Sequence, residues 1–261
     1  MLRASLLLLW WILTGCNPAP GSTSTLTLQL RVNDKPLSCD SVFSLTDEAV
    51  SLTDKAISQA GRVWQLQQFQ LYVSNFRLNN RPLLLDTAAL HQQADIALLG
   101  TVCDGADNWQ LQFATPLAAG QLSFTLGVPA VLNHQDPLRA AAPLNQSDMF
   151  WSWQQGYKYL RLDIHSTAQP AQQWSLHLGA TGCRSASPMR APEADCNKPN
   201  RVTINLDYLP GQQLILDLAP ILAGVNLSAD NHCMSDPNRL SCQTLLPRLG
   251  IGALPQGWSM Q

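Results

Sequence analysis

Two tryptophans separated by a single serine, Trp151 and Trp153, form the most unusual chemical group in the sequence. In an extended strand, side chains two residues apart project from the same face, so the two indoles are expected to lie side by side. Composition alone favours a packing role, because aromatic side chains stabilise cores and cross-strand pairs. Indole is also oxidisable, and paired indoles can pass an electron hole, so redox chemistry is the sharper hypothesis.

Histidine and methionine side chains supply the candidate metal ligands. His134 lies in a predicted loop, and His177 lies in a predicted strand. Imidazole nitrogen is a common metal ligand, and the thioether of Met234 suits soft ions such as Cu⁺. The five histidines are scattered, however, with no H-x-x-x-H or H-x-H pair. Spacing alone therefore gives a weak metal signal, and a hydrogen-bonded structural role is the commoner one for any single histidine.

Six cysteines downstream of the N-terminal region predict disulfides. An even number of cysteines in an exported chain is typical of up to three disulfides, with fifteen possible pairings. The sequence has no C-x-x-C motif, so a zinc-ribbon or thioredoxin-like site has little support. The short spacings favour Cys183 with Cys196 and Cys233 with Cys242, which leaves Cys39 with Cys103 as a long-range pair.

The N-terminus is predicted to be a lipoprotein signal peptide covering residues 1–15. Arg3 precedes an apolar run that is too short to span a bilayer. The run ends in Leu-Thr-Gly-Cys, which is similar to a bacterial lipobox, so we expect cleavage before Cys16 and lipidation of its thiol. An ordinary secretory signal is the alternative. Residues 16–25 would form a flexible tether, and Asn17 favours an outer-membrane location facing the periplasm.

Composition excludes two broad classes of protein. The 261 residues are 46% apolar and 13% charged, which does not describe a disordered chain. A net charge of −2 gives no basic surface for nucleic acid. Hydrolase and nucleotide-binding signatures are also missing, because the sequence contains no G-x-S-x-G, no Gly-rich phosphate loop and no H-E-x-x-H.

Alternating apolar and polar residues, separated by turn-forming Asn, Asp, Gly and Pro, predict an all-β protein. We expect a single-domain β-sandwich-like fold over residues 26–261, with an open barrel as the alternative. Short helical segments are predicted at 46–60, where an extended loop is the alternative, and at 217–223. The predicted strands cover residues 26–32, 71–78, 121–126, 157–164, 173–178 and 201–206.

The order and combination of several segments resemble the MbnP family. Members of this family are periplasmic copper-binding proteins paired with di-haem, peroxidase-like MbnH proteins. The resemblance covers nearly all of the chain after the signal peptide. The segments that carry it are residues 71–78, Leu126-Gly127-Val128-Pro129, Leu132-Asn133-His134, Pro143-Leu144-Asn145, 149–154, Gly156-Tyr157-Lys158, His177-Leu178-Gly179 and Cys233-Met234-Ser235.

The resemblance implies a copper site completed by a modified tryptophan. In the family, the di-haem partner oxidises the first Trp of a W-x-W motif to kynurenine, and copper binding depends on that change. Trp151 occupies this position, and Trp153 would pack against the modified ring or relay the electron hole. Opening the indole makes chemical sense, because it releases an aniline nitrogen and a ketone from a ring nitrogen that is a poor ligand. His134 and His177 are the implied imidazole ligands.

The remaining candidates are weaker. Met234 is a minor ligand candidate, because its neighbours suggest a disulfide-stapled turn. His91, His165 and His232 are expected to be surface residues or to support ligands. Six cysteines besides Cys16 exceed the four that give the family an older name, so one pair is expected to be peculiar to this branch.

The resemblance thus implies a non-enzymatic protein that binds copper, as Cu⁺, in copper homeostasis, and the lipobox predicts that it is a lipoprotein, whereas family members can also be freely soluble. It would be the substrate of a di-haem MbnH-like protein, would contact the membrane through its lipid alone and would not bind nucleic acid. One alternative is a cell-envelope binding module whose Trp151 and Trp153 stack on a carbohydrate. Another is a copper oxidase, which would need an open coordination position.

Overall fold

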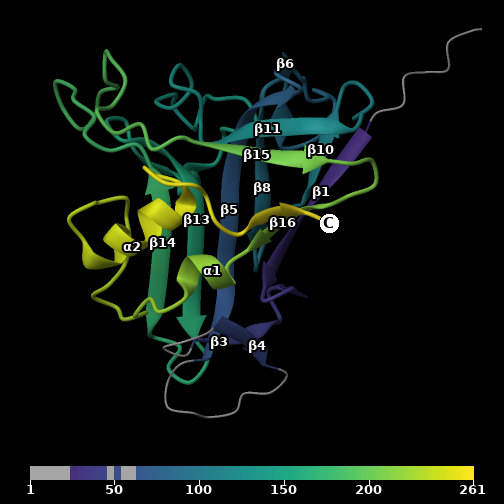
Figure 1. Cartoon of the computed structure of the whole chain (residues 1–261). Helices are drawn as coiled ribbons and strands as arrows, with labels where there is room; N and C mark the ends of the chain where they lie inside the picture. The colour runs from purple at the N-terminus through teal and green to yellow at the C-terminus, as the bar shows by residue number, and fades with distance from the viewer. Residues whose placement is uncertain (1–23, 46–49, 54–62) are drawn as a thin grey trace, which may run out of the picture.

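The computed structural model describes residues 24–45, 50–53 and 63–261, and β-strands are the main secondary structure among them (Figure 1). Cys16 and the predicted signal peptide lie outside the described residues, so lipidation stays a prediction. The first strand, β1 (Ser24–Val32), begins two residues before the predicted one. The last two residues of the predicted tether are therefore part of a sheet.

The larger sheet is built around one long strand, β5 (Val63–Leu78), which runs through the centre of Figure 1. Every strand pair in this sheet is antiparallel. Its main path is β12-β13-β5-β11-β15, and β14 pairs with β13 at one side. The bounds of the larger strands are β8 (Ile96–Val102), β11 (Gly120–Leu126), β12 (Phe150–Ser152), β13 (Gly156–Ser166), β14 (Gln173–Gly179) and β15 (Val202–Tyr208). The short strands are β3 (Val42–Leu45), β4 (Val50–Thr53), β6 (Arg81–Pro82), β7 (Gln92–Gln93) and β9 (Asp107–Asn108).

The smaller sheet contains β1 and packs against the larger one. It has the order β10-β1-β16-β17, with β2 also paired to β1. Its other strands are β2 (Lys35–Pro36), β10 (Gln110–Phe113), β16 (Leu214–Asp217) and β17 (Trp258–Met260). Alternate residues of β1 are buried, as the sequence pattern predicts.

Aromatic contacts join the two sheets. The rings of Phe124 on β11 and Trp258 on β17 have centroids 5.4 Å apart, and those of Phe76 on β5 and Phe113 on β10 are 5.6 Å apart. Edge-to-face pairs of this kind are a favourable core arrangement. The predicted all-β, sandwich-like fold is confirmed.

The helical segments match the predictions in part. Helix α1 (Ala219–Leu222) lies within the predicted 217–223 segment. At 46–60, residues 50–53 form strand β4 instead, because they pair with β3; the other residues of that segment lie outside the described ones. The sequence analysis missed α2 (Leu240–Leu249), which buries Leu245 and Leu249, and the single turn η1 (Ser147–Met149).

The three disulfides connect the pairs that the spacing favours. Cys39–Cys103 links the segment before β3 to the end of β8, and Cys183–Cys196 closes the loop between β14 and β15. Cys233–Cys242 fastens the segment beside β14 to α2. Within the described ranges, no helix combines the length and the hydropathy needed to cross a bilayer.

Candidate metal site

The site is built on the face of β13 and β14 that points away from the core. Leu160, Leu162 and Ile164 alternate along β13 and are buried in the core. The residues between them carry polar side chains on the opposite face. The strand register places Arg161 opposite His177. A row of polar groups is thereby held on a rigid sheet rather than on a loop.

His177 is the central member of this polar row. Its Nε2 lies 2.8 Å from Oδ1 of Asp163, and its Nδ1 is buried with no hydrogen-bond partner among the residues that the structure describes. The carboxylate of Asp163 accepts a second hydrogen bond, at 2.6 Å, from Nε of Arg161. An ionised carboxylate can only accept, so Nε2 of His177 carries the proton and Nδ1 exposes its lone pair.

The electrostatics keep this pair in the form that binds metal. Burial raises the pKa of Asp163, but hydrogen bonds from His177 and Ser175 and the charge of Arg161 lower it by more, so the carboxyl stays ionised. Burial lowers the pKa of His177, against the opposing effect of Asp163. A neutral imidazole with one bare nitrogen is the ligand form of histidine.

Trp151 lies against the same end of β14. A Cβ atom added to Gly179 would overlap the six-membered ring of Trp151, with Cη2 of that ring only 2.9 Å away. Gly179 follows His177 by two residues, so both face the same side of the strand. The absence of a side chain at Gly179 is what allows the half-buried Trp151 ring to sit beside the polar row.

Trp153 does not stand beside Trp151 on an extended strand, and that expectation is wrong. Strand β12 ends at Ser152, and the chain turns through residues 153–155 to begin β13 at Gly156, whose φ is +79°. The indole of Trp153 instead makes an edge-to-face contact with Phe150, with ring centroids 6.2 Å apart. The turn therefore places Trp153 outside the strand that carries Trp151.

His134 is held by this same turn. Its Nδ1 lies 3.1 Å from the backbone oxygen of Trp153, and because a carbonyl only accepts, Nδ1 carries the proton. The other nitrogen, Nε2, lies 3.2 Å from Nδ2 of Asn133 and 3.8 Å from Sγ of Cys196. Burial is the largest effect on the pKa of His134 and lowers it, so the imidazole is neutral.

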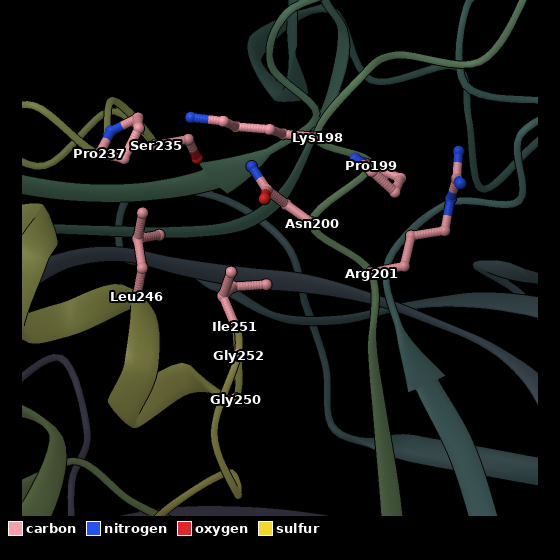
Figure 2. A pocket seen from close by; sticks show the side chains of 10 residues that line it. All are labelled: Lys198, Pro199, Asn200, Arg201, Ser235, Pro237, Leu246, Gly250, Ile251 and Gly252. Atoms are coloured by element: carbon pink, nitrogen blue, oxygen red, sulfur yellow. The ribbon is translucent and has the colours of Figure 1, made fainter.

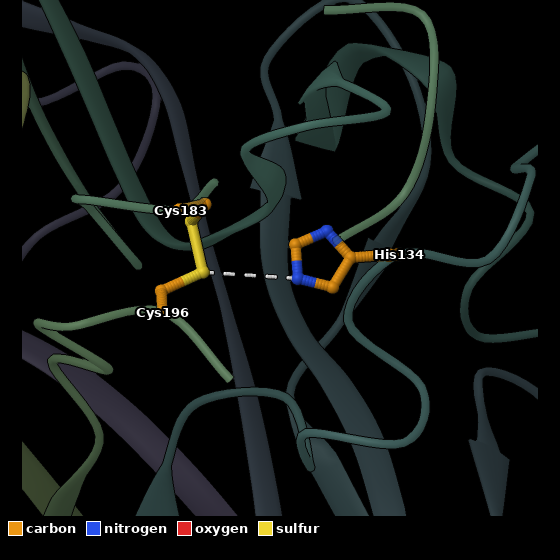
Figure 3. Close-up of side chains that lie close together, drawn as sticks. All are labelled: His134, Cys183 and Cys196. Carbon is orange, nitrogen blue, oxygen red and sulfur yellow. Dashed lines mark hydrogen bonds between the residues drawn. A yellow bond between two sulfur atoms is a disulfide. The ribbon is translucent and has the colours of Figure 1, made fainter. Parts of the chain in front are cut away.

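The nitrogen of His134 and the sulfurs of Cys183 and Cys196 lie within 4.8 Å of one another (Figure 3). A metal would find two sulfurs and one nitrogen there. The two sulfurs are bonded to each other, however, and the thiolate rather than the disulfide is the metal ligand. Neither a hydrogen bond nor an ion pair joins His134 to His177 among the contacts of the described residues.

The backbone around His177 is fixed from the far edge of β14. Its N–H donates to the backbone oxygen of Cys233 at 2.8 Å, and its carbonyl accepts from Oγ of Ser235 at 2.9 Å. Ser235 Oγ also accepts from the N–H of Gly179, and Asn200 Nδ2 donates to the oxygen of Gly179, each at 2.8 Å. These contacts hold the strand end that carries both the imidazole and the Trp151 ring.

Ser235 and Asn200 also line a surface pocket of about 440 Å³ beside α2 (Figure 2). Lys198 and Arg201 contribute cationic side chains to its rim, and Leu246 and Ile251 contribute apolar ones. The guanidinium of Arg201 is already paired with Asp195 at 2.8 Å. Because Ser235 and Asn200 also hydrogen-bond to Gly179, the pocket adjoins the end of β14.

The other predicted residues have structural or surface positions. Nδ1 of His232 accepts from the N–H of Ser175 at 2.9 Å, which is a structural role. Met234 is 39% exposed. His91 and His165 are half-buried, and His165 follows Asp163 on the polar face of β13, opposite Gln173.

Sequence reasoning missed Asp163, Gly179, Asn133 and Ser235. Asn133, Gly179 and Ser235 lie inside the segments that carry the resemblance, although no role was assigned to them. Asp163 carried a weak signal, an acidic residue in a strand whose alternate positions are apolar. Its pairing with His177 depends on strand register, which the sequence does not reveal.

The fold and the site define a class: a disulfide-stapled β-sandwich that buries a partly unsatisfied imidazole beside a tryptophan. The MbnP family model matches residues 21–235, and the chain therefore belongs to the MbnP family, which is associated with metal binding. The fold is similar to that of MbnP from Methylosinus trichosporium, with a TM-score of 0.69, 23% sequence identity and 89% of each chain covered. A comparison with curated protein sequences gives no match.

Proposed function

We propose that this protein binds copper, as Cu⁺, at a site formed by His177, His134 and a kynurenine derived from Trp151, and that it serves copper homeostasis. The observation that carries the proposal is the buried Nδ1 of His177, which has no hydrogen-bond partner in the part of the chain that the structure describes. Burying a polar atom without a partner is unfavourable, so such an atom calls for a ligand. Cu⁺ accepts imidazole nitrogen as a ligand.

The donors present fit the metal only if Trp151 is changed. An intact indole nitrogen has its lone pair in the ring system and donates but does not ligate. Conversion to kynurenine replaces it with an aniline nitrogen and a ketone, on a ring that already sits over Gly179 beside His177. This chain's contribution is to hold the ring and the imidazole together on a rigid strand end.

The maturation enzyme is proposed to be a di-haem, peroxidase-like protein, with this chain as its substrate rather than an enzyme in its own right. We further propose that the protein is anchored through lipid on Cys16, in the outer membrane facing the periplasm. The packing of Trp151 on Gly179 speaks against the carbohydrate-binding alternative, since a sugar platform needs a freely exposed ring face.

The deciding experiment is peptide mass spectrometry of the protein co-produced with its di-haem partner. We expect residue 151 to lose one carbon and gain one oxygen. The modified protein is then titrated with Cu⁺ against a competing chelator. Intact Trp151 in the presence of an active partner would overturn the maturation model, and modified protein that binds no copper would overturn the site.

Matched variants separate the roles of the residues. Trp151→Phe is expected to abolish copper binding with the fold intact, whereas Trp258→Phe, at a half-buried tryptophan of the smaller sheet, should bind normally. His177→Ala should weaken binding after Trp151 has been modified, and His165→Ala is its control. Normal copper binding by His177→Ala would refute the ligand assignment.

A further inference from the structure

We propose that His134, Cys183 and Cys196 form a second, redox-gated metal site, which is closed while the disulfide is intact and binds one Cu⁺ ion when it is reduced. The two thiolates and one imidazole would give the ion three soft or borderline donors. This site needs no modified tryptophan, but it would use the same Nε2 of His134 as the proposed kynurenine site, so the two sites would compete for that ligand.

The geometry of the donors is already in place around the disulfide. The three ligand atoms lie within 4.8 Å of one another, and Nε2 of His134 is 3.8 Å from Sγ of Cys196 (Figure 3). The Nδ1–H of His134 donates to the backbone oxygen of Trp153, which fixes the ring and leaves the lone pair on Nε2, the atom nearer the sulfur. That lone pair accepts from Nδ2 of Asn133 at 3.2 Å, a hydrogen bond that the ion would replace. A backbone carbonyl behind a ligating histidine is a common way to set its tautomer.

The backbone would keep the two cysteines close after the S–S bond opens. Thr181 and Lys198, each two residues from a cysteine, exchange two backbone hydrogen bonds of 2.9 and 3.0 Å. The N–H of Asn197 also donates to the oxygen of Gly182 at 3.4 Å. The thiols would therefore stay at the neck of the loop, and little ordering would remain for the metal to impose.

The other two disulfides do not have this arrangement. Cys233 and Cys242 are fully buried. Among the contacts of the described residues, Cys39 and Cys103 meet a threonine hydroxyl and a backbone carbonyl, without an imidazole. Cys183, by contrast, is half-buried at the start of a largely exposed loop, so a reductant can reach its sulfur.

The gating step is an ordinary thiol–disulfide exchange. A dithiol reductant supplies two electrons and two protons, its own sulfurs join as a disulfide, and Cys183 and Cys196 become free thiols. Each thiol then loses its proton to solvent as its sulfur binds Cu⁺. The ion is not itself oxidised or reduced.

The test uses the Trp151→Phe protein, so that failure of the kynurenine site does not affect the result. The protein is treated with limiting dithiol, and mass spectrometry identifies which cysteines have become free. Oxidised and reduced samples are then titrated with Cu⁺ under anaerobic conditions against a chelator. We expect one Cu⁺ per chain in the reduced sample and none in the oxidised one.

Two further measurements identify the ligands. Bound Cu⁺ should protect Cys183 and Cys196 of the reduced protein from alkylation, and this readout needs no cysteine variant to fold. His134→Ala in the same background should bind Cu⁺ at least about tenfold more weakly, since even outer-shell losses reach that size. The Cys183→Ser/Cys196→Ser double variant should bind none after the same dithiol treatment.

Three results would overturn the proposal. Equal Cu⁺ binding by the oxidised and reduced samples would show that the disulfide does not control binding. Protection of other cysteines instead of Cys183 and Cys196 would place the ion elsewhere. Unchanged affinity in His134→Ala would reduce the site to an unspecific pair of thiols.

Discussion

Nε2 of His177 lies 2.8 Å from Oδ1 of Asp163, and the two residues come from neighbouring strands, β14 and β13. This pairing decides which nitrogen of the imidazole is free. It also keeps a negative charge behind the ring, which raises the basicity of a ligating histidine. Asp163 in turn accepts a hydrogen bond from Arg161, two residues earlier on β13, so the row of linked side chains continues along that strand.

Replacing Asp163 tests this relationship. Asp163→Asn keeps an oxygen that accepts from His177 but removes the charge, and Asp163→Ala removes both. In protein with modified Trp151, we expect the copper affinity to fall in both variants, by roughly 10–100-fold in Asp163→Ala and less in Asp163→Asn. Chelator competition measures it, with the exposed Asp207→Asn as control. Equal affinities in all four proteins would exclude Asp163 from the site.

Gly179→Ala tests the packing of the Trp151 ring against Gly179. The new methyl group would overlap that ring, so the indole must move or the strand end must shift. We expect a loss of about 1–3 kcal/mol in the free energy of unfolding, as for other overpacked sites, and a lower yield of kynurenine at residue 151. Gly105→Ala is the matched control, because its Cβ would make ordinary contacts at 3.5 Å or more. Wild-type stability and modification in Gly179→Ala would contradict this packing.

The stability of the protein should rise with pH from about 8 toward the unfolded pKa of lysine. Burial, followed by repulsion from Arg161, lowers the pKa of Lys158 to about 8. Its folded pKa is below its unfolded one, so between these values the unfolded chain binds more protons and alkali favours the folded state. The shift sets an upper limit of about 3 kcal/mol across the whole interval, because solvent screens the part of the side chain that stays hydrated.

Denaturant unfolding at pH 7, 8, 9 and 9.5 measures this effect. Lys158→Met should flatten the rise, because it removes the titrating group and keeps a side chain of similar length. The range stops below pH 10, since tyrosines whose pKa is raised by burial, such as Tyr159 at about 12, favour unfolding above it. An equal slope in the wild type and in Lys158→Met would assign the pH dependence to other groups.

Loss of either of two disulfides should lower stability, but only one of the two losses should also lower copper affinity. Removing Cys39–Cys103 or Cys233–Cys242 with paired serines is expected to cost roughly 2–5 kcal/mol of unfolding free energy. Copper affinity should fall only in the second variant, because the oxygen of Cys233 accepts from the N–H of His177. Unfolding curves and copper titrations of both variants measure these two effects. An equal fall in copper affinity in both variants would mean that the loss of overall stability, rather than loss of the Cys233–His177 hydrogen bond, weakens binding.

The sequence predicted the features that depend on local pattern. Alternation along residues 26–32 and 173–178 predicts strands, and the structure confirms both, although His177 and Gly179 at the end of the second strand are buried as well. The disulfide pairs follow the short spacings, since cysteines close in sequence meet easily. The ring of Trp151 lies over Gly179, two residues after His177, so the two segments that the resemblance assigned to one site meet at the end of β14.

The features that depend on register or turn geometry were not predictable. Trp153 lies outside the strand of Trp151 because β12 ends between the two residues, and no residue type marks that point. The partner of His177 is reached diagonally across the β13–β14 pair, since Asp163 lies opposite Ser175 and Arg161 lies opposite His177. The approach of His134 to the Cys183–Cys196 sulfurs joins segments far apart in the chain.

The segment around Cys233 also has a consequence for how this protein meets other chains. It runs parallel to β14 and bonds to its outer edge, with Cys233 N–H donating to the oxygen of Ser175. A strand at the border of a sheet otherwise offers unpaired N–H and C=O groups to any passing strand. The covalent tie to α2 keeps this cover in place, so the border next to His177 is protected against edge-to-edge aggregation.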